Sequence, residues 1–199
     1  MNKEIAFFDF DGTITTKDSL LEFIKYAVKR SSYYLGILSL IPWGAAYKLK
    51  LIPNYRAKEK LITTFFKGWD ADQFQQVAKQ YSLEQIDKII RPQAMEKISW
   101  HQKRGHTVVI VSASLEPWLN KWCQKHNIDL IATRLKFHRG KVTGRLAGKN
   151  CYGTEKVNRI RERYNLSEYS VVYAYGDSKG DRELLSLADH AYYRHFHRV

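Results

Sequence analysis

The stretch Glu-Ile-Ala-Phe-Phe-Asp-Phe-Asp-Gly-Thr, residues 4–13, joins a short apolar run to a cluster of acidic and small residues. Two more apolar runs end in a similar way. Residues 107–111 (TVVIV) lead into Ser-Ala-Ser at 112–114, and residues 171–175 (VVYAY) lead into Gly-Asp-Ser at 176–178. Continuous apolar runs of this length are typical of strands buried on both faces of a parallel sheet. The sequence therefore predicts three strands that each end in polar residues.

Helical stretches follow or separate these runs. We expect helices near 115–126, 154–164 and 180–187, and a tight hairpin at His-Arg-Gly-Lys, residues 138–141. Strands that alternate with helices indicate an α/β fold with a doubly wound parallel sheet.

The carboxyl ends of parallel strands form the usual ligand crevice of such a sheet. Polar residues follow all three predicted strands at that edge. We therefore expect the following side chains around one crevice: Asp9, Asp11, Ser112 and Asp177.

Residues 15–90 lack the alternation of strands and helices. Their apolar spacing predicts helices at 18–30, 55–66 and 70–90, and Ser82 with Gln85 can cap a separate helix within the last of these. We interpret 15–90 as a helical cap inserted after the first strand. The catalytic core then comprises residues 1–14 and 91–199.

Asp9-x-Asp11-Gly12-Thr13 is the strongest local motif. Two carboxylates just past a buried strand can divide the work of phosphoryl transfer. Asp9 can attack phosphorus as a nucleophile, and Asp11 can protonate the leaving alkoxide and later deprotonate water. The alternative is an ordinary turn, since Asp and Gly are common turn residues.

Gly176-Asp177-Ser178-x-x-Asp181 suggests a metal site. Mg²⁺ is commonly held by one or two carboxylates together with water and substrate phosphate. Asp177 beside Asp9 can complete such a site, and Asp181 can support it. The alternative is that Asp177 and Ser178 turn the chain and cap a helix.

Three other side chains are candidates for binding phosphate. Ser112 ends its predicted strand, and Lys156 begins a predicted helix from which its ammonium can neutralise phosphate and Asp9. Ser114 has the features of an N-cap, with Pro117 tolerated in the first helical turn, and we favour that role for it. A solvated surface position is the alternative for Lys156.

Taken together, the sequence resembles the haloacid dehalogenase (HAD) superfamily. Its four motifs match DFDGT at 9–13, VSAS at 111–114, Lys156, and GDSKGD at 176–181. The resemblance implies that Asp9 is the nucleophile and Asp11 the general acid/base. It also implies Mg²⁺ bound through Asp9, the Asp11 carbonyl and Asp177, with Asp181 assisting. The phosphate-contacting positions that match are Thr13, Ser112, Ala113, Ser114 and Lys156.

The helical insertion and the stretch Asn150 to Lys156 resemble the phosphoserine-phosphatase-like branch, subfamily IB. In that branch an acidic residue and an arginine of the lid bind the amino acid, and the matching positions here are Asp18 and Arg56. Asp replaces the usual Glu, and the lid that follows is more apolar than expected. The lid and motifs also resemble the phosphatidylglycerophosphatase C family, which implies a glycerophospholipid phosphate as substrate.

Residues 31–47 contain no charged residue, yet basic residues flank them on both sides. Across residues 19–68 there are nine basic residues and two acidic ones. A spanning helix needs about 20 apolar residues, and Pro42 interrupts this stretch. The segment can contact an anionic membrane interface, or it can form buried cap core or a dimer contact.

The chain has 199 residues, 44% of them hydrophobic, and a formal charge of +13. That charge favours anionic partners such as a phosphorylated small molecule, a lipid phosphate or nucleic acid. No nucleic-acid motif is present and an acidic crevice repels phosphate backbones, so we expect no nucleic-acid partner. A phosphotransferase on the same scaffold stays open as an alternative. Two cysteines and an N-terminus interrupted by charge predict a cytoplasmic protein, with membrane contact at the inner face.

Overall fold

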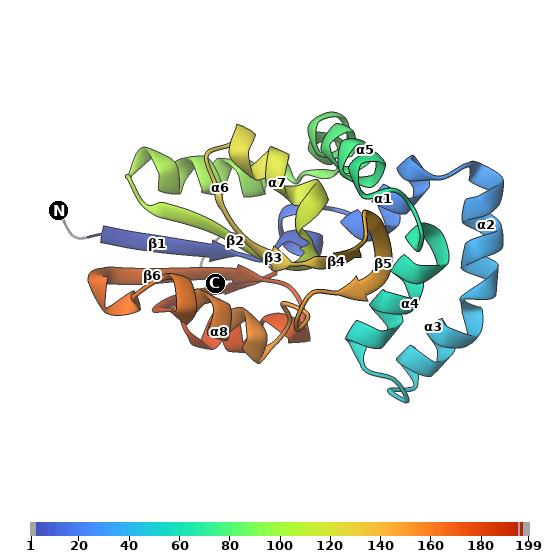
Figure 1. Ribbon diagram of the computed structural model, residues 1–199. Helices are drawn as coiled ribbons and strands as arrows, with labels where there is room; N and C mark the ends of the chain where they lie inside the picture. Colours follow the sequence, from blue (N-terminus) through green and yellow to red (C-terminus); the bar gives the residue numbers. More distant parts are fainter. Residues whose placement is uncertain (1–2, 195, 197–199) are drawn as a thin grey trace.

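The computed structural model describes residues 3–194 and 196. Five parallel strands form the central sheet in the order β3-β2-β1-β6-β7 (Figure 1). Their bounds are β1 Lys3–Phe8, β2 Thr107–Leu115, β3 Asp129–Thr133, β6 Tyr169–Gly176 and β7 His190–Tyr193. The three predicted apolar runs form the middle of this sheet, as β2, β1 and β6.

Alternate residues of the central strand pack into two separate clusters. Ile5 and Phe7 join one cluster with Ile160 and Leu184, whereas Ala6 and Phe8 join the other. Ile160 belongs to α8 and Leu184 to α9, and the opposite cluster contains side chains of α6 and α7. Burial on both faces explains the continuous apolar runs. The predicted doubly wound α/β class is confirmed.

The helices fall into two groups along the chain. Those between β1 and β2 are α1 Ser19–Ala27, α2 Arg30–Ser39, α3 Ile41–Lys48, α4 Asn54–Phe66, α5 Ala71–Glu84 and α6 Pro92–Lys103. Those after β2 are α7 Glu116–Lys125, α8 Thr154–Arg163 and α9 Arg182–Ser186. Short helical turns occupy Phe10–Ile14, Ile86–Ile89, Leu166–Glu168 and Lys179–Asp181. Helices α1 to α5 lie beyond the carboxyl ends of the strands, at the right of Figure 1, while α6 and α7 cover one sheet face.

The predicted helix at 18–30 is too long. Helix α1 ends at Ala27, because Val28 is extended, and residues 30–48 form two further helices. Neither α2 nor α3 contains a buried residue. Leu40, between the two helices, is the one buried residue of 31–47, so this segment adds only a small part to the core of the cap and is mostly exposed. In the described part of the chain no helix is both long and apolar enough to cross a membrane.

The predicted hairpin is confirmed as β4 Leu135–His138 and β5 Lys141–Leu146, joined at Arg139 and Gly140, which both have positive φ. It lies against the inserted helices: the Gly68 amide donates to the Val142 carbonyl over 2.9 Å. Residues 135–146 thus pack with the helices of 15–90, although they follow β2 in the chain.

Two smaller expectations need correction. Ser82 does not cap a new helix, because it lies inside α5 and its Oγ accepts a hydrogen bond from the Trp122 amide at 2.9 Å. Strand β2 does not end at Val111 but continues to Leu115, so Ser114 is a strand residue and no N-cap.

Phe23 of α1 anchors the inserted helices to the sheet layer. Its ring stacks on Trp118 of α7 with centroids 4.6 Å apart, and it also contacts rings of α4 and α5. Phe23 is fully buried. This aromatic cluster therefore joins segments that are far apart in the sequence.

We expect Phe23→Ala to lower the free energy of unfolding by about 3–5 kcal/mol, because it leaves a cavity between α1 and α7. Urea unfolding followed by tryptophan fluorescence measures the change. The control is Leu21→Ala on the exposed side of α1, which should change stability by less than about 0.5 kcal/mol. Equal losses in both variants contradict an anchoring role for Phe23.

Candidate active site

The strands bring the predicted polar residues to one end of the sheet. Asp9 directly follows β1, Ser112 lies in the last part of β2, and Asp177 directly follows β6. The Asp9 amide donates to the Tyr175 carbonyl over 2.9 Å, so the pairing of β1 with β6 continues up to the first carboxylate. Segments separated by more than 160 residues thus meet at one crevice.

The turn after Asp9 requires glycine. Gly12 has a φ of +88°, and a Cβ there would lie 2.5 Å from Asp177 Oδ2. The missing side chain lets the Asp177 carboxylate lie against the turn. Thr13 Oγ1 then donates to Asp177 Oδ1 over 3.1 Å and lies 3.5 Å from Asp9 Oδ2. Thr13 therefore orients the two acids.

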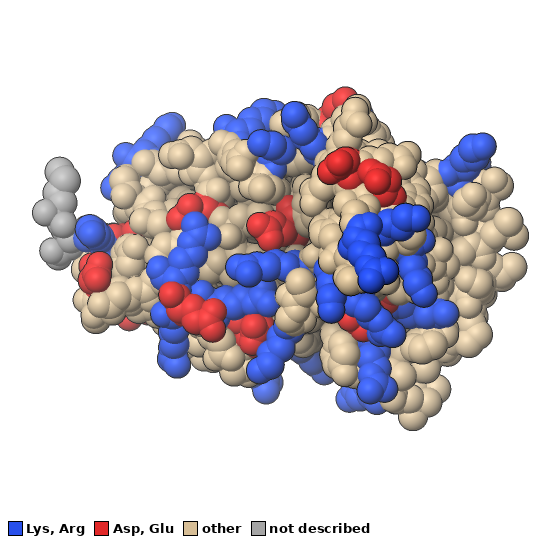
Figure 2. All heavy atoms as spheres, viewed as in Figure 1, with Lys and Arg blue, Asp and Glu red and all other residues tan. Residues whose placement is uncertain are grey.

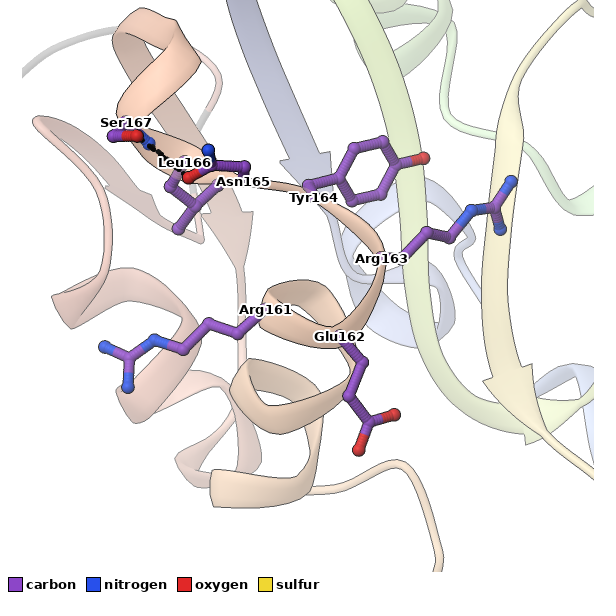
Figure 3. A pocket seen from close by; sticks show the side chains of 7 residues that line it. All are labelled: Arg161, Glu162, Arg163, Tyr164, Asn165, Leu166 and Ser167. Atoms are coloured by element: carbon purple, nitrogen blue, oxygen red, sulfur yellow. Dashed lines mark hydrogen bonds between the residues drawn. The ribbon is translucent and has the colours of Figure 1, made fainter.

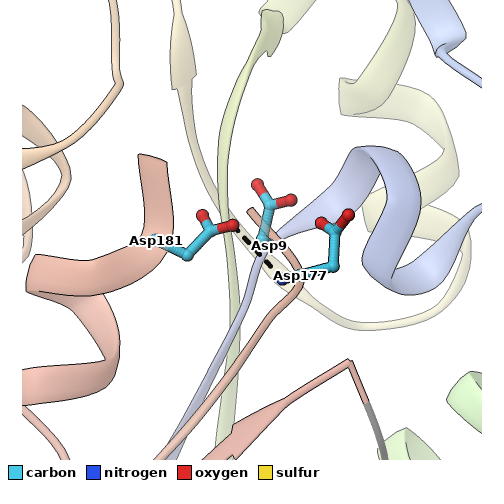
Figure 4. A group of neighbouring side chains, drawn as sticks. All are labelled: Asp9, Asp177 and Asp181. Carbon is cyan, nitrogen blue, oxygen red and sulfur yellow. Dashed lines mark hydrogen bonds between the residues drawn. The ribbon is translucent and has the colours of Figure 1, made fainter. Parts of the chain in front are cut away.

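Asp9, Asp177 and Asp181 each place one oxygen within 4.8 Å of the others (Figure 4). Burial raises the pKa of Asp9 to about 7, although Lys156 partly opposes the shift. Burial also raises the pKa of Asp177, against a hydrogen bond from Thr13. Three carboxylates beside a single contacting ammonium leave excess negative charge. Hard oxygen donors with unbalanced negative charge fit a divalent cation such as Mg²⁺.

Both carboxylate oxygens of Asp181 accept hydrogen bonds. Its Oδ1 accepts from Lys156 Nζ at 2.7 Å, and its Oδ2 accepts from the Ser178 amide at 3.0 Å and the Ser178 hydroxyl at 2.7 Å. Burial opposes ionisation of Asp181, yet Lys156 and Ser178 outweigh it and lower the pKa of Asp181. These contacts suit a carboxylate that holds the Asp177–Ser178 turn and Lys156 in place.

Lys156 lies in the first turn of α8 and is almost wholly buried, so the alternative of a solvated surface lysine is wrong. Its Nζ is 2.5 Å from Asp9 Oδ1 as well as 2.7 Å from Asp181. Burial disfavours the ammonium, but the two carboxylates outweigh it and raise the pKa of Lys156. Lys156 is therefore charged and links Asp9 to Asp181.

Asp11 is held in a different way from Asp9. Its Oδ1 accepts from the Ser19 amide at 2.8 Å, and its Oδ2 accepts from the Ser114 hydroxyl. Burial and the nearby charge of Asp18 raise the pKa of Asp11 to about 6, against these hydrogen bonds. Ser114 thus donates a hydrogen bond to Asp11, whereas the sequence favoured a role as a helix N-cap. Neutral donors hold Asp11, whereas an ammonium holds Asp9.

A pocket of about 200 Å³ opens between the strand ends and the inserted helices. The predicted residues that line it are Asp9, Asp11, Asp18, Ser112, Ala113, Ser114, Lys156 and Asp181. Asp18 also caps α1, since its Oδ1 accepts from the Leu21 amide at 2.9 Å. Thr13 and Asp177 are not among the lining residues, but Thr13 contacts both Asp9 and Asp177.

Arg56 does not line the pocket, and Lys58 of the same helix does. Arg56 is exposed, whereas Lys58 Nζ donates to the Ala113 carbonyl over 2.6 Å and to Asn150 Oδ1 over 3.1 Å. Burial lowers the pKa of Lys58, against the attraction of Asp11. Helix α4 thus contributes a cationic side chain to the pocket, but this side chain is Lys58 and not Arg56 as predicted.

Asn54 and Tyr152 also line the pocket and were not predicted. Asn54 lies four residues before Lys58, on the same face of α4, so helical periodicity could have grouped them. Tyr152 lies just before α8 without any motif of its own. Nothing in its local sequence distinguishes it from an ordinary loop tyrosine.

A second depression, of about 600 Å³, is formed by residues 161–167 (Figure 3). It lies where α8 ends and the chain turns into the amino end of β6. Asp9 and Asp177 instead follow the carboxyl ends of their strands. This depression therefore belongs to the opposite end of the sheet and takes no part in the site.

Comparison with known proteins agrees with this geometry. The family model described as haloacid dehalogenase-like hydrolase matches residues 6–186. Protein CicA of Caulobacter vibrioides is 36% identical over 194 residues, which cover 95% of this chain and 85% of CicA. A protein named probable phosphatase Rv3661, from Mycobacterium tuberculosis, is 31% identical over an alignment that covers 94% of this chain and 67% of Rv3661.

Among solved structures, a protein of unknown function from Bordetella pertussis Tohama I has a TM-score of 0.82 at 19% identity. The match covers 97% of this chain and 89% of that protein, and it shows a shared fold. The chain belongs to the haloacid dehalogenase-like hydrolase family.

We expect Mg²⁺ to stabilise the protein against unfolding, and Asp177→Asn to abolish that effect. At one hundred times Kd the gain is about 2.7 kcal/mol, and a thermal shift titration measures it without any turnover. The metal-free variant should be at least as stable as the wild type, because it carries one less like charge beside Asp9. The control is Asp72→Asn in the first turn of α5. An unchanged Mg²⁺ response in Asp177→Asn contradicts the metal site.

Proposed function

We propose that the chain is a Mg²⁺-dependent phosphomonoester hydrolase that forms an aspartyl-phosphate on Asp9. The observation that carries this proposal is that two carboxylates in one pocket have different hydrogen-bond partners. Asp9 is bound to the Lys156 ammonium, and Asp11 accepts only neutral hydrogen bonds. Such a pair suits a nucleophile beside a proton donor. Family membership and the relative named as a probable phosphatase support the same reaction.

The reaction has two steps. The Asp9 carboxylate attacks phosphorus, the bond between phosphorus and the leaving oxygen breaks, and Asp11 donates a proton to that oxygen. Asp11 then takes a proton from water, whose oxygen attacks phosphorus and restores Asp9. Lys156 offsets charge at Asp9 throughout. Mg²⁺ held by Asp9, the Asp11 carbonyl and Asp177 would supply further charge neutralisation at the phosphate oxygens.

Residues at the end of β2 are the proposed contacts to the phosphate. Ser112 Oγ accepts a hydrogen bond from the Ser114 amide at 2.9 Å. Its hydroxyl proton is not used in the contacts that the structure describes, so it can be donated to a phosphate oxygen. Ser112, Ala113 and Lys156 line the same pocket as Asp9. Together they provide a hydroxyl, a backbone edge and an ammonium for the phosphate oxygens.

The proposed substrate is a glycerophospholipid phosphate such as phosphatidylglycerophosphate, in keeping with the resemblance to subfamily IB and the phosphatidylglycerophosphatase C family. The alternative of a phosphoserine-like metabolite needs a lid arginine beside Asp18. Arg56 is exposed and outside the pocket lining. Lys58 lines the pocket in its place, and a lysine lacks the paired donors with which an arginine binds a carboxylate, so the lining favours the lipid phosphate over phosphoserine.

We also propose that the inserted helices contact an anionic membrane surface through an apolar hairpin, defined as residues 34–55. It contains nine of the thirteen large apolar side chains that are exposed in the described part of the chain. Figure 2 shows few charges along the outer edge of these helices, at the right, with basic side chains gathered beside it. An apolar face beside cations suits an anionic interface, where each lysine or arginine contributes about 1 kcal/mol.

We expect Asp9→Asn to lower kcat for an aryl phosphate by at least about a thousandfold, because the amide cannot act as the nucleophile. Steady-state release of the phenol measures the rate, and Asp72→Asn is the matched control. In water labelled with ¹⁸O, hydrolysis by the wild type places labelled oxygen in the released phosphate. Transfer to an added alcohol would instead identify a phosphotransferase, and wild-type rates in Asp9→Asn contradict the nucleophile.

We expect the protein to float with vesicles that contain anionic lipid and not with neutral vesicles. Added salt should weaken the binding because it screens the basic flanks. The double variant Leu35→Asp, Leu38→Asp should stay in the soluble fraction, whereas Leu83→Asp, an exposed position on α5, should float like the wild type. Absence of the wild type from both kinds of vesicle rules against the contact. A dimer lost in the double variant would assign the hairpin to a second copy.

A further inference from the structure

A cavity of about 560 Å³ adjoins the catalytic pocket and has no role in the proposed chemistry. Its walls include Pro53 and Tyr55 from the start of α4, Leu146 from the end of β5, and Tyr152. Asn54 and Tyr152 line both this cavity and the catalytic pocket. The two spaces therefore share a wall. We call the larger one the side cavity.

The catalytic pocket is too small for a large substrate. Its volume of about 200 Å³ is below the range of roughly 300–1,000 Å³ that ligand pockets usually occupy, whereas the side cavity falls within it. Acidic, hydroxyl and ammonium groups form most of the smaller space, which suits the phosphate. The leaving group of a larger phosphomonoester must extend beyond it.

The acidic residues on the side cavity's walls are neutralised. Glu59 accepts from Arg145 at 2.8 Å and from the Leu146 amide at 3.0 Å. Glu155 pairs with Arg159 at 3.0 Å. Their charges are thus satisfied from outside the cavity. The other wall residues are the apolar or aromatic Pro53, Tyr55, Leu146 and Tyr152, together with Asn54, Gly148, Lys149 and Asn150.

The boundary between the two spaces is built from a fixed set of contacts. Asn150 Nδ2 donates to Asn54 Oδ1 over 2.9 Å, and Asn150 Oδ1 accepts from Lys58. The Tyr152 ring lies against Gly180, where a Cβ would be 2.2 Å from it. Gly180 directly precedes Asp181. One edge of the side cavity is therefore held next to the catalytic carboxylates.

The side cavity is also continuous with the apolar hairpin. Tyr55 belongs to both, and Leu49 and Leu51, which are 69% and 72% exposed, precede Pro53 in the α3–α4 connection. Exposed apolar side chains thus lead from the hairpin to the cavity, with the exposed lysines Lys48 and Lys50 beside them. This continuity favours a flexible hydrocarbon chain over a polar leaving group.

We propose that the side cavity binds the hydrocarbon chain of an amphiphilic phosphomonoester whose phosphate occupies the catalytic pocket. The inference rests on the proposed phosphatase function and adds a binding site to it. The chain lies against Tyr55, Leu146 and Tyr152, and its burial contributes to the selection of substrate. Tyr55 lines only the side cavity, so it acts on the leaving group and does not touch the phosphate.

The test uses n-alkyl phosphates from methyl to octyl, each below its micelle concentration, so that no membrane or aggregate takes part. The wild type should show kcat/KM rising with chain length, by up to about fourfold for each methylene that becomes buried. Tyr55→Ala should flatten this rise, and Tyr55→Phe should retain it. The matched control is Tyr34→Ala, an exposed tyrosine of the hairpin that does not line the side cavity.

Alkylphosphonates of the same lengths, which cannot be hydrolysed, provide a second measurement through their inhibition or binding constants. If phosphonate affinity rises with chain length and Tyr55→Ala removes that rise, the result supports the cavity even without turnover. Hydrolysis of methyl phosphate with no dependence on chain length overturns the cavity and leaves the phosphatase intact. Equal flattening by Tyr55→Ala and Tyr34→Ala overturns it as well. If no ester is hydrolysed yet the phosphonates still bind by length, the reaction fails and the cavity stands.

Discussion

The buried contact of Lys156 with Asp9 and Asp181 is the interaction on which the whole site depends. An ammonium and two carboxylates taken out of water are costly unless they pair closely, and removal of one partner of such a cluster costs about 3–5 kcal/mol. The cluster forms only when β1, α8 and the turn after β6 meet. Correct assembly of the sheet and the position of Asp9, the proposed nucleophile, are therefore linked. Burial raises the pKa values of Asp9 and Asp177, and the ammonium of Lys156 offsets this only in part.

The inserted helices add a cationic side chain to the acids and serines at the strand ends. The carboxyl ends of the strands supply acids and serines, while α4 supplies Lys58, whose ammonium contacts the carbonyl of Ala113 beside Ser112. Asn150 connects this lysine to Asn54 and, through Thr133, to the end of β3. The position of α4 is thus coupled to the edge of the sheet that is proposed to bind phosphate. A shift of this helix would change the contact at Ala113 and the wall of the side cavity together.

The sequence predicted those features that follow from neighbours along the chain. An apolar run followed by Asp needs only a buried strand to place the carboxylate at the crevice, so the central strands and Asp9, Asp11 and Asp177 were found. The hydroxyl of Ser114 was misassigned, although the two-residue period of a strand puts it on the same face as Ser112. Arg56 and Lys58 differ by about 200° around α4, so only one can face the pocket, and only packing decides which.

The exposure of the apolar hairpin could not be derived from its composition, since both buried and exposed forms were consistent with uncharged residues. The packing shows why it stands out. Gly36 of α2 lies against the Phe65 ring, where a Cβ would be 2.4 Å away, and Tyr33 stacks on the same ring at 6.2 Å. One face of α2 is thereby used against α4, and the residues that remain, Leu35 and Leu38 among them, face outward. Helices of 10 and 8 residues are marginal alone, so this short contact fixes their position. The apolar hairpin continues from this outward face through α3 to Pro53 and Tyr55, which line the side cavity. An apolar surface on that side can bind the hydrocarbon part of a substrate, whereas on the side of Lys156 and Asp181 it would reach only the phosphate.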